Sequence, residues 1–226
     1  MGLRAPLIVS LLLVAGMLAV SAWAWPLIPD SARIAVHWNF DGQPNGFASK
    51  ETALLLGPVG GSAFTLLFFL LPFFTKRRAN LAKSAAAYKI GWIGTLLALA
   101  VAHIMVIMHA RGILLDIAGN AVFMFALLMT ALGNFLGKTH PNPYVGVRTP
   151  WTKRSDYSWE KTNRAAGRLF VAVGLLTLGV LAVGDTHAAK YVLLGGILTA
   201  ALISVALSYV YWMRDPARQS FDGASK

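Results

Sequence analysis

The sequence has no cysteine and few charged residues. Among its 226 residues there is no Cys and only 9 are Asp or Glu. The lack of cysteine excludes disulfides, Cys-ligated zinc, Fe–S clusters and thiol nucleophiles. Charged residues make up 13% of the chain, whereas a soluble domain carries about 25%. Hydrophobic residues make up 57%, more than one core could bury. The composition therefore excludes an ordinary soluble domain and predicts an all-α, polytopic membrane protein.

Hydrophobic stretches of about 20 residues, long enough to cross a bilayer as a helix, occur six times. They cover residues 6–25, 54–74, 90–109, 113–136, 165–183 and 191–213. The first stretch resembles a signal peptide, but Trp23 and Trp25 at its end suit the aromatic belt of a membrane interface better than a cleavage site. We therefore expect six transmembrane helices, with the first one retained.

The basic residues predict the orientation of these helices. If the N-terminus is cytoplasmic, 16 of the 20 lysines and arginines fall in cytoplasmic segments. This bias predicts that both termini are cytoplasmic. It also accounts for the net charge of +11 without direct nucleic-acid binding. Two longer loops follow: an extracytoplasmic cap at residues 26–53 and a cytoplasmic loop at residues 137–164. They divide the chain into an N-terminal region, 1–110, and a C-terminal region, 111–226.

The cap has the pattern of a small ordered structure. Apolar and polar residues alternate from Ile34 to Asp41, as in a half-exposed strand. Asp41-Gly42 and Asn45-Gly46 are turn signals, and Ser49 is placed to cap the second span. His37, Asn39 and Asp41 would share one side of the strand. A metal or proton-linked site there is one interpretation; the other, which we favour, is local hydrogen bonding, because one His and one carboxylate are too few metal ligands.

The cytoplasmic loop combines prolines with aromatic and basic residues. Pro141, Pro143 and Pro150 exclude a continuous helix. Residues 155–167 have the pattern of an amphipathic helix that leads into the fifth span, with Trp151 and Trp159 as membrane anchors. The basic residues that would face lipid phosphates are Arg148, Lys153, Arg154, Lys161, Arg164 and Arg168. A lipid anchor and a docking face for a cytoplasmic protein both fit this pattern.

Several polar groups lie within or near the spans. Asp116, Asn120, Thr130 and Asn134 share one side of the fourth span, although Phe123 and Leu127 interrupt the stripe. His103 lies in the middle of the third span, and His109 near its outer end. One interpretation is an ion pair near the outer surface together with hydrogen bonds between helices. The other is a polar path for protons or a peptide.

Motifs in both loops resemble those of a known family. In the cytoplasmic loop they are Gly-Asn-x-Leu-Gly-Lys from Gly133, Pro-Asn-x-x-x-Gly-x-Arg-Thr-Pro-Trp-Thr from Pro141, and Trp-x-Lys-Thr-x-Arg-x-x-Gly from Trp159. They resemble the signature of the SdpI family of bacterial membrane immunity proteins. The cap motif, with His37-Trp38-Asn39 at its centre, resembles the small domain of unknown function that commonly precedes it. One departure is Asn163, where the family often has histidine.

The resemblance implies a multi-pass protein of the bacterial cytoplasmic membrane that gives resistance to a membrane-active peptide toxin. It also implies a signalling role, in which the protein retains a cytoplasmic winged-helix repressor. A small transporter or exporter of a peptide or lipid-like substrate is the alternative. We expect membrane lipids as partners, no enzymatic activity, no metal and no cofactor.

The candidate residues on the toxin side are His37, Trp38, Asn39, Asp41, Gly42 and Asp116. The candidates in the cytoplasmic loop are Asn134, Asn142, Gly146, Arg148, Thr149, Pro150, Trp151, Thr152, Trp159, Thr162 and Arg164. The intramembrane polar candidates are His103 and Asn120.

The charge asymmetry makes the topology testable. Reporter fusions after residues 45 and 188 should report an extracytoplasmic position, and fusions after residues 80, 155 and 226 a cytoplasmic one. A fusion after residue 155 that reports from outside would contradict the orientation.

Overall fold

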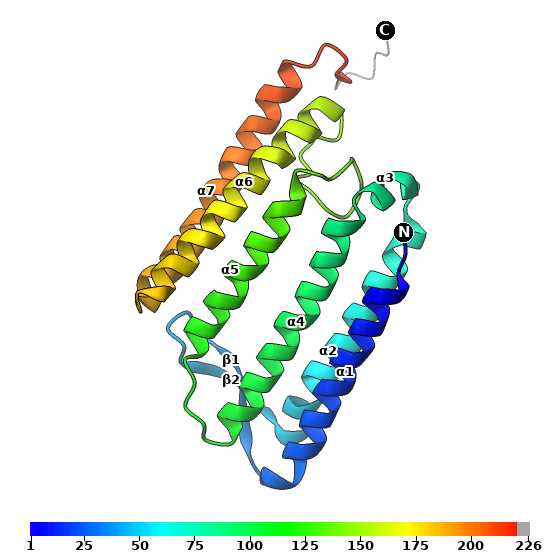
Figure 1. Cartoon of the computed structure of the whole chain (residues 1–226). Coiled ribbons are helices and arrows are strands. Elements are labelled where there is room, and N and C mark those ends of the chain that lie inside the picture. Colours follow the sequence, from blue (N-terminus) through cyan, green and yellow to red (C-terminus); the bar gives the residue numbers. More distant parts are fainter. Residues whose placement is uncertain (221–226) are drawn as a thin grey trace. The chain divides into compact units, whose positions relative to one another are not determined.

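The computed structural model describes residues 1–220 and is mainly helical (Figure 1). Six of its helices are long and apolar enough to cross a membrane, which confirms the predicted number within this described part. In chain order the elements are α1 (Arg4–Ala24), η1 (Trp25–Leu27), β1 (Arg33–Trp38), β2 (Pro44–Ser49), α2 (Lys50–Leu70), η2 (Leu71–Phe74), α3 (Arg78–Lys83), α4 (Ala85–Ala110), α5 (Ile117–Leu136), α6 (Asp156–Ala182) and α7 (Thr186–Met213).

Polar caps shift the starts of two spans from their predicted positions. The fourth span begins at Ile117 rather than at residue 113, because Asp116 Oδ1 accepts a hydrogen bond from the Gly119 amide at 2.8 Å. The fifth begins at Asp156 rather than at residue 165. Ser155 Oγ accepts from the Ser158 amide at 2.8 Å. The predicted amphipathic helix and the fifth span are thus one continuous helix, α6.

The helices and strands form two compact units. The N-terminal unit contains residues 2–71 and 92–124, and the C-terminal unit contains chiefly residues 72–91 and 125–220. Helices α4 and α5 each contribute to both units, because residue 91 divides α4 and residue 124 divides α5.

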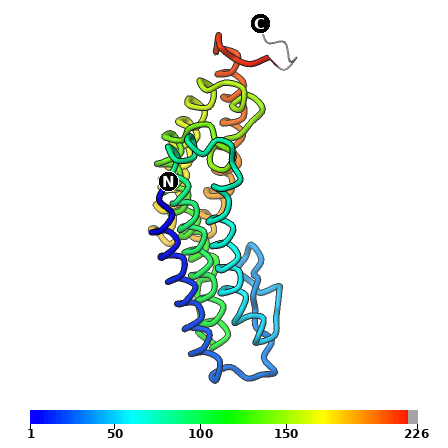
Figure 2. Tube along the Cα trace, turned by 90° about the vertical axis from the view of Figure 1, so that its right-hand side faces the viewer, coloured from blue at the N-terminus to red at the C-terminus, as the bar shows by residue number. Residues whose placement is uncertain are grey.

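The N-terminal unit has its apolar core where the cap meets the helices. Ile34 of β1 packs with Leu54 of α2 and Ile107 of α4 in a buried cluster, which also includes Ile28. The hairpin of β1 and β2 connects α1 to α2, and Figure 2 shows it as the blue segment after the end of α1. The hairpin therefore contributes side chains to the core and is part of the packed unit.

The cap hairpin confirms one predicted turn and corrects the other. Strands β1 and β2 pair antiparallel, and the turn between them contains Gly42 at a φ of +77°, where glycine is favoured. The predicted Asn45-Gly46 turn was wrong, because both residues lie inside β2 and Gly46 pairs with His37. A Cβ on Gly46 would lie 2.9 Å from His37 Cβ. Gly46 thus permits the close approach of two strands. In the sequence alone, an Asn-Gly pair inside a strand looks the same as one in a turn.

The C-terminal unit depends on close approach of small residues. A Cβ on Gly167 of α6 would lie 2.5 Å from the carbonyl oxygen of Gly133 on α5. Further along the same pair, a Cβ on Gly174 would lie 2.6 Å from the Ala126 carbonyl oxygen. Such small residues let two helix backbones pack closely, as is usual between membrane helices, where lipid provides no hydrophobic drive. Helices α6 and α7 run side by side (Figure 1).

The glycine contact predicts a matched pair of effects. Gly167→Ala should lower the free energy of unfolding in detergent by about 1–3 kcal/mol, because the added methyl group forces α5 and α6 apart. Gly179→Ala lies on the same helix with nothing within 4 Å of its Cβ. It should be neutral or slightly stabilising, because alanine favours the helix. Equal thermal midpoints for the two variants would contradict the close contact.

Candidate functional site

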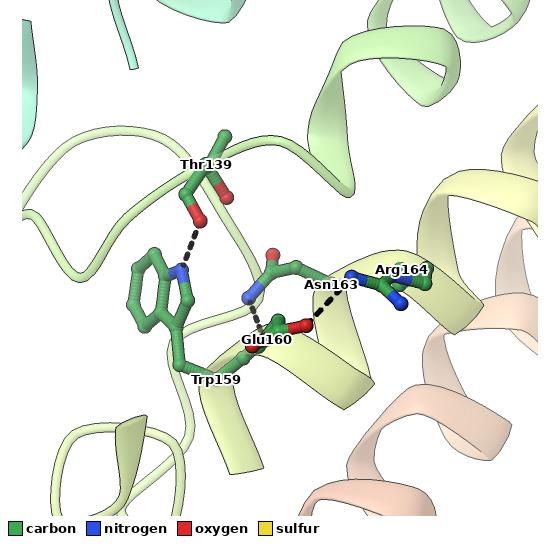
Figure 3. Close-up of polar contacts among 5 residues, drawn as sticks. All are labelled: Thr139, Trp159, Glu160, Asn163 and Arg164. Atoms are coloured by element: carbon green, nitrogen blue, oxygen red, sulfur yellow. Dashed lines mark hydrogen bonds and ion pairs between the residues drawn. The ribbon is translucent and has the colours of Figure 1, made fainter. Parts of the chain in front are cut away.

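The loop between α5 and α6, residues 137–155, packs its backbone on the first turns of α6. We call it the α5–α6 loop. The indole of Trp159 is 2% exposed, and its Nε1 donates a hydrogen bond to the Thr139 carbonyl at 3.0 Å (Figure 3). The predicted role of Trp159 as a membrane anchor was therefore wrong. Its side chain fixes the loop from inside, since a buried indole N–H needs an acceptor.

Gly146 and Asn163 continue this attachment. Gly146 has a φ of +133°, and a Cβ there would lie 2.7 Å from the Trp159 ring. The amide of the next residue, Val147, donates to Asn163 Oδ1 at 2.7 Å, and Asn163 Nδ2 donates to the Trp159 carbonyl at 2.9 Å. Asn163 is fully buried. The family that the chain resembles often has histidine at this position. In this chain the Asn163 side chain accepts a hydrogen bond from the loop backbone.

Asn142 organises the proline-rich start of the loop. Its Oδ1 accepts from the amides of Tyr144 and Val145 at 2.8 and 2.9 Å, and its Nδ2 donates to the Val145 carbonyl at 3.0 Å. Ser84, at the start of α4, accepts from the His140 amide at 2.9 Å. Proline has no backbone N–H, so this segment cannot form the regular backbone hydrogen bonds of a helix. The side-chain hydrogen bonds of Asn142 and Ser84 fix its conformation instead.

Thr149 and Thr152 form a reciprocal turn further along. The Thr149 amide donates to Thr152 Oγ1 at 2.9 Å, and the Thr152 amide donates to Thr149 Oγ1 at 3.1 Å. Thr149 Oγ1 also donates to Ser208 Oγ of α7 at 2.9 Å. Both threonines are buried. The backbone is therefore held on both sides of Arg148: by Asn163 at Val147, and by the turn and its bond to α7 at Thr149.

Arg148 lies between these two attachments and is exposed. Val147 is held by Asn163 and Thr149 is held by Thr152, whereas no hydrogen bond or ion pair within residues 1–220 involves the Arg148 guanidinium. This geometry presents a planar cation from a fixed backbone. Such a group can bind a carboxylate or phosphate through two parallel hydrogen bonds.

The other loop candidates are distributed over different surroundings. Trp151 packs edge-on against Tyr209 of α7 with ring centroids 5.3 Å apart, and Pro150 is exposed. Thr162 is fully buried, and its Oγ1 has no hydrogen-bond partner among the described residues. Arg164 is exposed and pairs with Glu160 at 2.6 Å (Figure 3). Asn134 is exposed on α5. The structure thus buries Asn142, Thr149, Thr152, Trp159 and Thr162, and it leaves Asn134, Arg148, Pro150 and Arg164 on the surface.

Sequence reasoning missed a polar contact that joins the chain after α7 to the α5–α6 loop. Ser155 Oγ donates to Asp215 Oδ2 at 2.5 Å, and the Gln219 amide donates to the Arg154 carbonyl at 2.9 Å. Asp215 is 7% exposed. Ser155 carried the signal of a helix cap, but nothing local in the sequence indicated that a carboxylate 60 residues away would share it.

In the cap, an ion pair that sequence reasoning missed joins the two ends of the hairpin. Lys50 Nζ lies 2.7 Å from Asp30 Oδ1, with the lysine side chain 4% exposed and the aspartate 90% exposed. The ammonium also lies 5.4 Å from the centre of the Trp25 ring. The hydrogen bond and charge of Lys50 lower the pKa of Asp30. The sequence signal for this ion pair was the presence of Asp30 and Lys50 at the two ends of the cap motif.

The polar cap candidates form hydrogen bonds within the hairpin. Asn39 Oδ1 accepts from the amides of Asp41 and Gln43 at 3.0 and 2.9 Å, and His37 Nδ1 lies 2.6 Å from Asn45 Oδ1. This arrangement matches the local hydrogen-bonding interpretation. No cluster of three or more His, Cys, Asp or Glu that could hold a metal occurs in residues 1–220.

Four further candidates lie where the hairpin meets α4 and α5. Trp38 packs edge-on against His109 at a centroid distance of 5.6 Å. A Cβ on Gly42 would lie 3.4 Å from Ala118 Cβ. Asp116 caps α5, and Asn120 Nδ2 donates to the Asp116 carbonyl at 2.7 Å. Asp116 and Asn120 thus support the local backbone at the start of α5.

His103 forms a buried polar contact among three helices. Its Nε2 lies 2.9 Å from Ser21 Oγ and 3.3 Å from the Met17 carbonyl, both on α1. Ser21 Oγ donates to the Leu54 carbonyl on α2 at 2.6 Å. Because the Ser21 proton is used there, the network assigns the donating N–H to His103 Nε2. A Cβ on Gly57 would lie 2.5 Å from the His103 ring, so glycine provides the space for it.

The comparisons with known proteins agree with the motifs. Residues 138–212 match the SdpI/YfhL protein family, and residues 12–60 match a domain of unknown function, DUF1648. The chain is 24% identical to the immunity protein SdpI of Bacillus subtilis (strain 168) over 213 residues. The aligned region covers 92% of this chain and 96% of that protein. No solved structure matches the chain. These matches confirm the resemblance both in the cap and in the segment that contains the α5–α6 loop.

The Lys50–Asp30 pair predicts a pH-dependent contribution of the cap to stability. Asp30→Asn should lower the thermal midpoint in detergent at pH 7, because a buried ammonium loses its carboxylate. A carboxylate with a lowered pKa stabilises the fold above its unfolded pKa and loses that contribution on protonation. The difference from wild type should therefore shrink as the pH falls below the ordinary Asp value of 3.8. Asp156→Asn, on an exposed position of α6, should give a smaller effect; equal effects would contradict the role of the pair.

Proposed function

We propose that this protein gives a bacterium immunity to a membrane-active peptide toxin and acts in the cytoplasmic membrane. The observation that carries the proposal is the similarity to the immunity protein SdpI over 92% of the chain. Six helices that could span a membrane support the same conclusion. The cap segment precedes the SdpI/YfhL match in the chain, which is the order expected from the family resemblance. The role is one of binding and needs no enzymatic step.

The cap is the part of the chain that we propose to meet the toxin. It displays large apolar side chains on its surface, with Phe40 and Phe47 on the hairpin 42% and 50% exposed. Trp23, near the end of α1, is 49% exposed, and the Arg111 guanidinium lies 4.7 Å from the centre of its ring. A hydrophobic peptide that enters the membrane from outside would reach these side chains first. Trp38 of β1 packs against His109 of α4 and would keep the hairpin in position.

The α5–α6 loop is the part that we propose to hold a cytoplasmic regulator, a winged-helix repressor. The observation that favours this second role is the exposed Arg148 on a backbone held by Asn163 and Thr152. A general lipid anchor needs only positive charge, whereas recognition of a protein carboxylate benefits from a fixed guanidinium. Signalling and protection would then use different parts of the chain.

Transport of a peptide or lipid-like substrate is the rival function. It would require a polar path through the spans, and the stripe on α5 is its candidate. Asn120 and Thr130 donate to the backbone of their own helix, at 2.7 and 2.9 Å. Polar groups used in this way favour local helix support over a path.

Deletion and complementation in the source bacterium test the immunity proposal. The deletion strain should lose viability and membrane potential in mixed culture with its parent, and the wild-type gene should restore both. A transporter would instead show substrate accumulation or efflux that depends on the gene. Survival of the deletion strain equal to that of its parent would contradict immunity.

The loop proposal predicts that charge alone cannot replace Arg148. Arg148→Lys should reduce membrane retention of the repressor by about tenfold, since one charge-assisted hydrogen bond contributes roughly 1.5–3 kcal/mol. Lys153→Ala, at another exposed loop position, should change retention little. The measurement is the membrane-bound fraction of a fluorescent repressor, with both variants at wild-type abundance. If Lys153→Ala is as harmful as Arg148→Lys, the loop is an electrostatic anchor.

A further inference from the structure

A basic pocket opens between α6 and α7 within the C-terminal unit. Its lining consists of Lys161, Arg164, Ala165 and Arg168 from α6 together with Tyr211 from α7. Its volume is about 210 Å³, room for roughly seven water molecules at about 30 Å³ each. Three of its five lining residues are cations, so the pocket is suited to an anionic group.

The pocket lies on the face of α6 that does not hold the loop. Residues 161, 164 and 168 follow the i, i+3, i+7 spacing of one helix face, whereas Trp159 and Asn163 are buried under the loop. The resembling family signature includes Lys161 and Arg164, and neither takes part in attaching the α5–α6 loop. Apart from the exposed ion pair of Arg164 with Glu160, these two motif residues have no role in the contacts described so far.

The charges around the pocket leave a net positive site. Arg164 pairs with Glu160 at 2.6 Å, but the two side chains are 49% and 55% exposed, so water weakens the pair. Lys161 Nζ lies 5.5 Å from the centre of the Tyr157 ring, which packs edge-on against Tyr211. One carboxylate thus faces three cations, and an additional anion would be electrostatically favoured.

The position along α6 indicates the source of that anion. Lys161 and Arg168 are seven residues apart, roughly 10 Å along the helix axis, so the cations extend over somewhat more than one headgroup layer of about 5–8 Å. From Leu169 to Val183 the sequence has no charged residue. Leu175 and Leu176, on that apolar part, are 55% and 63% exposed. An anion in the pocket would therefore be at headgroup depth, with apolar helix surface below it.

We propose that this pocket binds the phosphate of an anionic phospholipid, with the acyl chains along the apolar part of α6. Arg168 and Arg164 would form charge-assisted hydrogen bonds to the phosphate oxygens, and the Tyr211 hydroxyl would donate a further one. Lys161 would contribute charge at the outer edge of the pocket. The site is independent of toxin binding and of the regulator, and it would fix the depth and rotation of α6 in the membrane.

Lipid binding to the full chain in detergent tests the proposal by native mass spectrometry. The probes are dioctanoyl phosphatidylglycerol, dioctanoyl phosphatidylcholine and inorganic phosphate. Wild type should bind phosphatidylglycerol about tenfold more tightly than phosphatidylcholine, and Arg164→Gln with Arg168→Gln should remove that preference. The control pair, Lys138→Gln with Lys153→Gln, removes the same charge outside the pocket and should leave the preference intact.

Two further variants protect the test from a folding failure. Tyr211→Phe keeps the ring contact with Tyr157 and should weaken phosphatidylglycerol binding by roughly threefold through the lost hydroxyl. Arg168→Lys should restore part of the affinity lost in Arg168→Gln. Equal losses in the pocket pair and the control pair would overturn the proposal in favour of general charge attraction. If inorganic phosphate saturates the pocket and displaces the lipid, the pocket is a site for free phosphate. If the wild type binds both lipids equally well, the proposed phospholipid site is contradicted.

Discussion

The packing of the Trp159 indole against the backbone of Gly146 is the contact on which the α5–α6 loop depends. Any side chain at residue 146 would occupy the space of the ring, since a Cβ there would lie 2.7 Å from it. Once the ring is in place, Asn163 is close enough to accept from the Val147 amide, and Thr139 can accept from the indole. The exposed position of Arg148 follows from these buried contacts, because its neighbours on both sides have no freedom to turn it inward.

The cap applies the same solution with different groups. A chain that leaves a helix carries backbone groups that the helix no longer satisfies and that need other hydrogen-bond partners. In the cap, Asn39 satisfies the amides of the hairpin turn, and Lys50 connects the helix start to Asp30. In the loop, Asn142 and Asn163 satisfy the amides around the prolines. At both places carboxamide side chains replace the missing helix bonds.

Local signals in the sequence predicted the fold well, and long-range contacts were beyond them. The six spans, strand β1 and the cap at Ser49 each depend on a few consecutive residues, so composition and spacing were sufficient. The burial of Trp159 depends on a loop that returns onto α6, and the bond from Ser155 to Asp215 joins residues 60 positions apart. An aromatic residue among basic ones has the same pattern at a lipid interface as under a loop. Only the fold distinguishes the two.

The motif of α6 therefore contains two sets of residues with different physical roles. Trp159, Asn163 and Gly167 face inward, where they hold the loop and allow α5 to approach. Lys161 and Arg164 line the pocket on the α7 side, and Arg148 projects from the loop that the inward set holds. Loss of an inward residue alters the position of everything attached to α6, so its effect on activity cannot be separated from its effect on folding. Loss of an outward cation leaves these contacts intact. Substitutions of the outward residues are accordingly the ones whose effects can be assigned to ligand, lipid or partner.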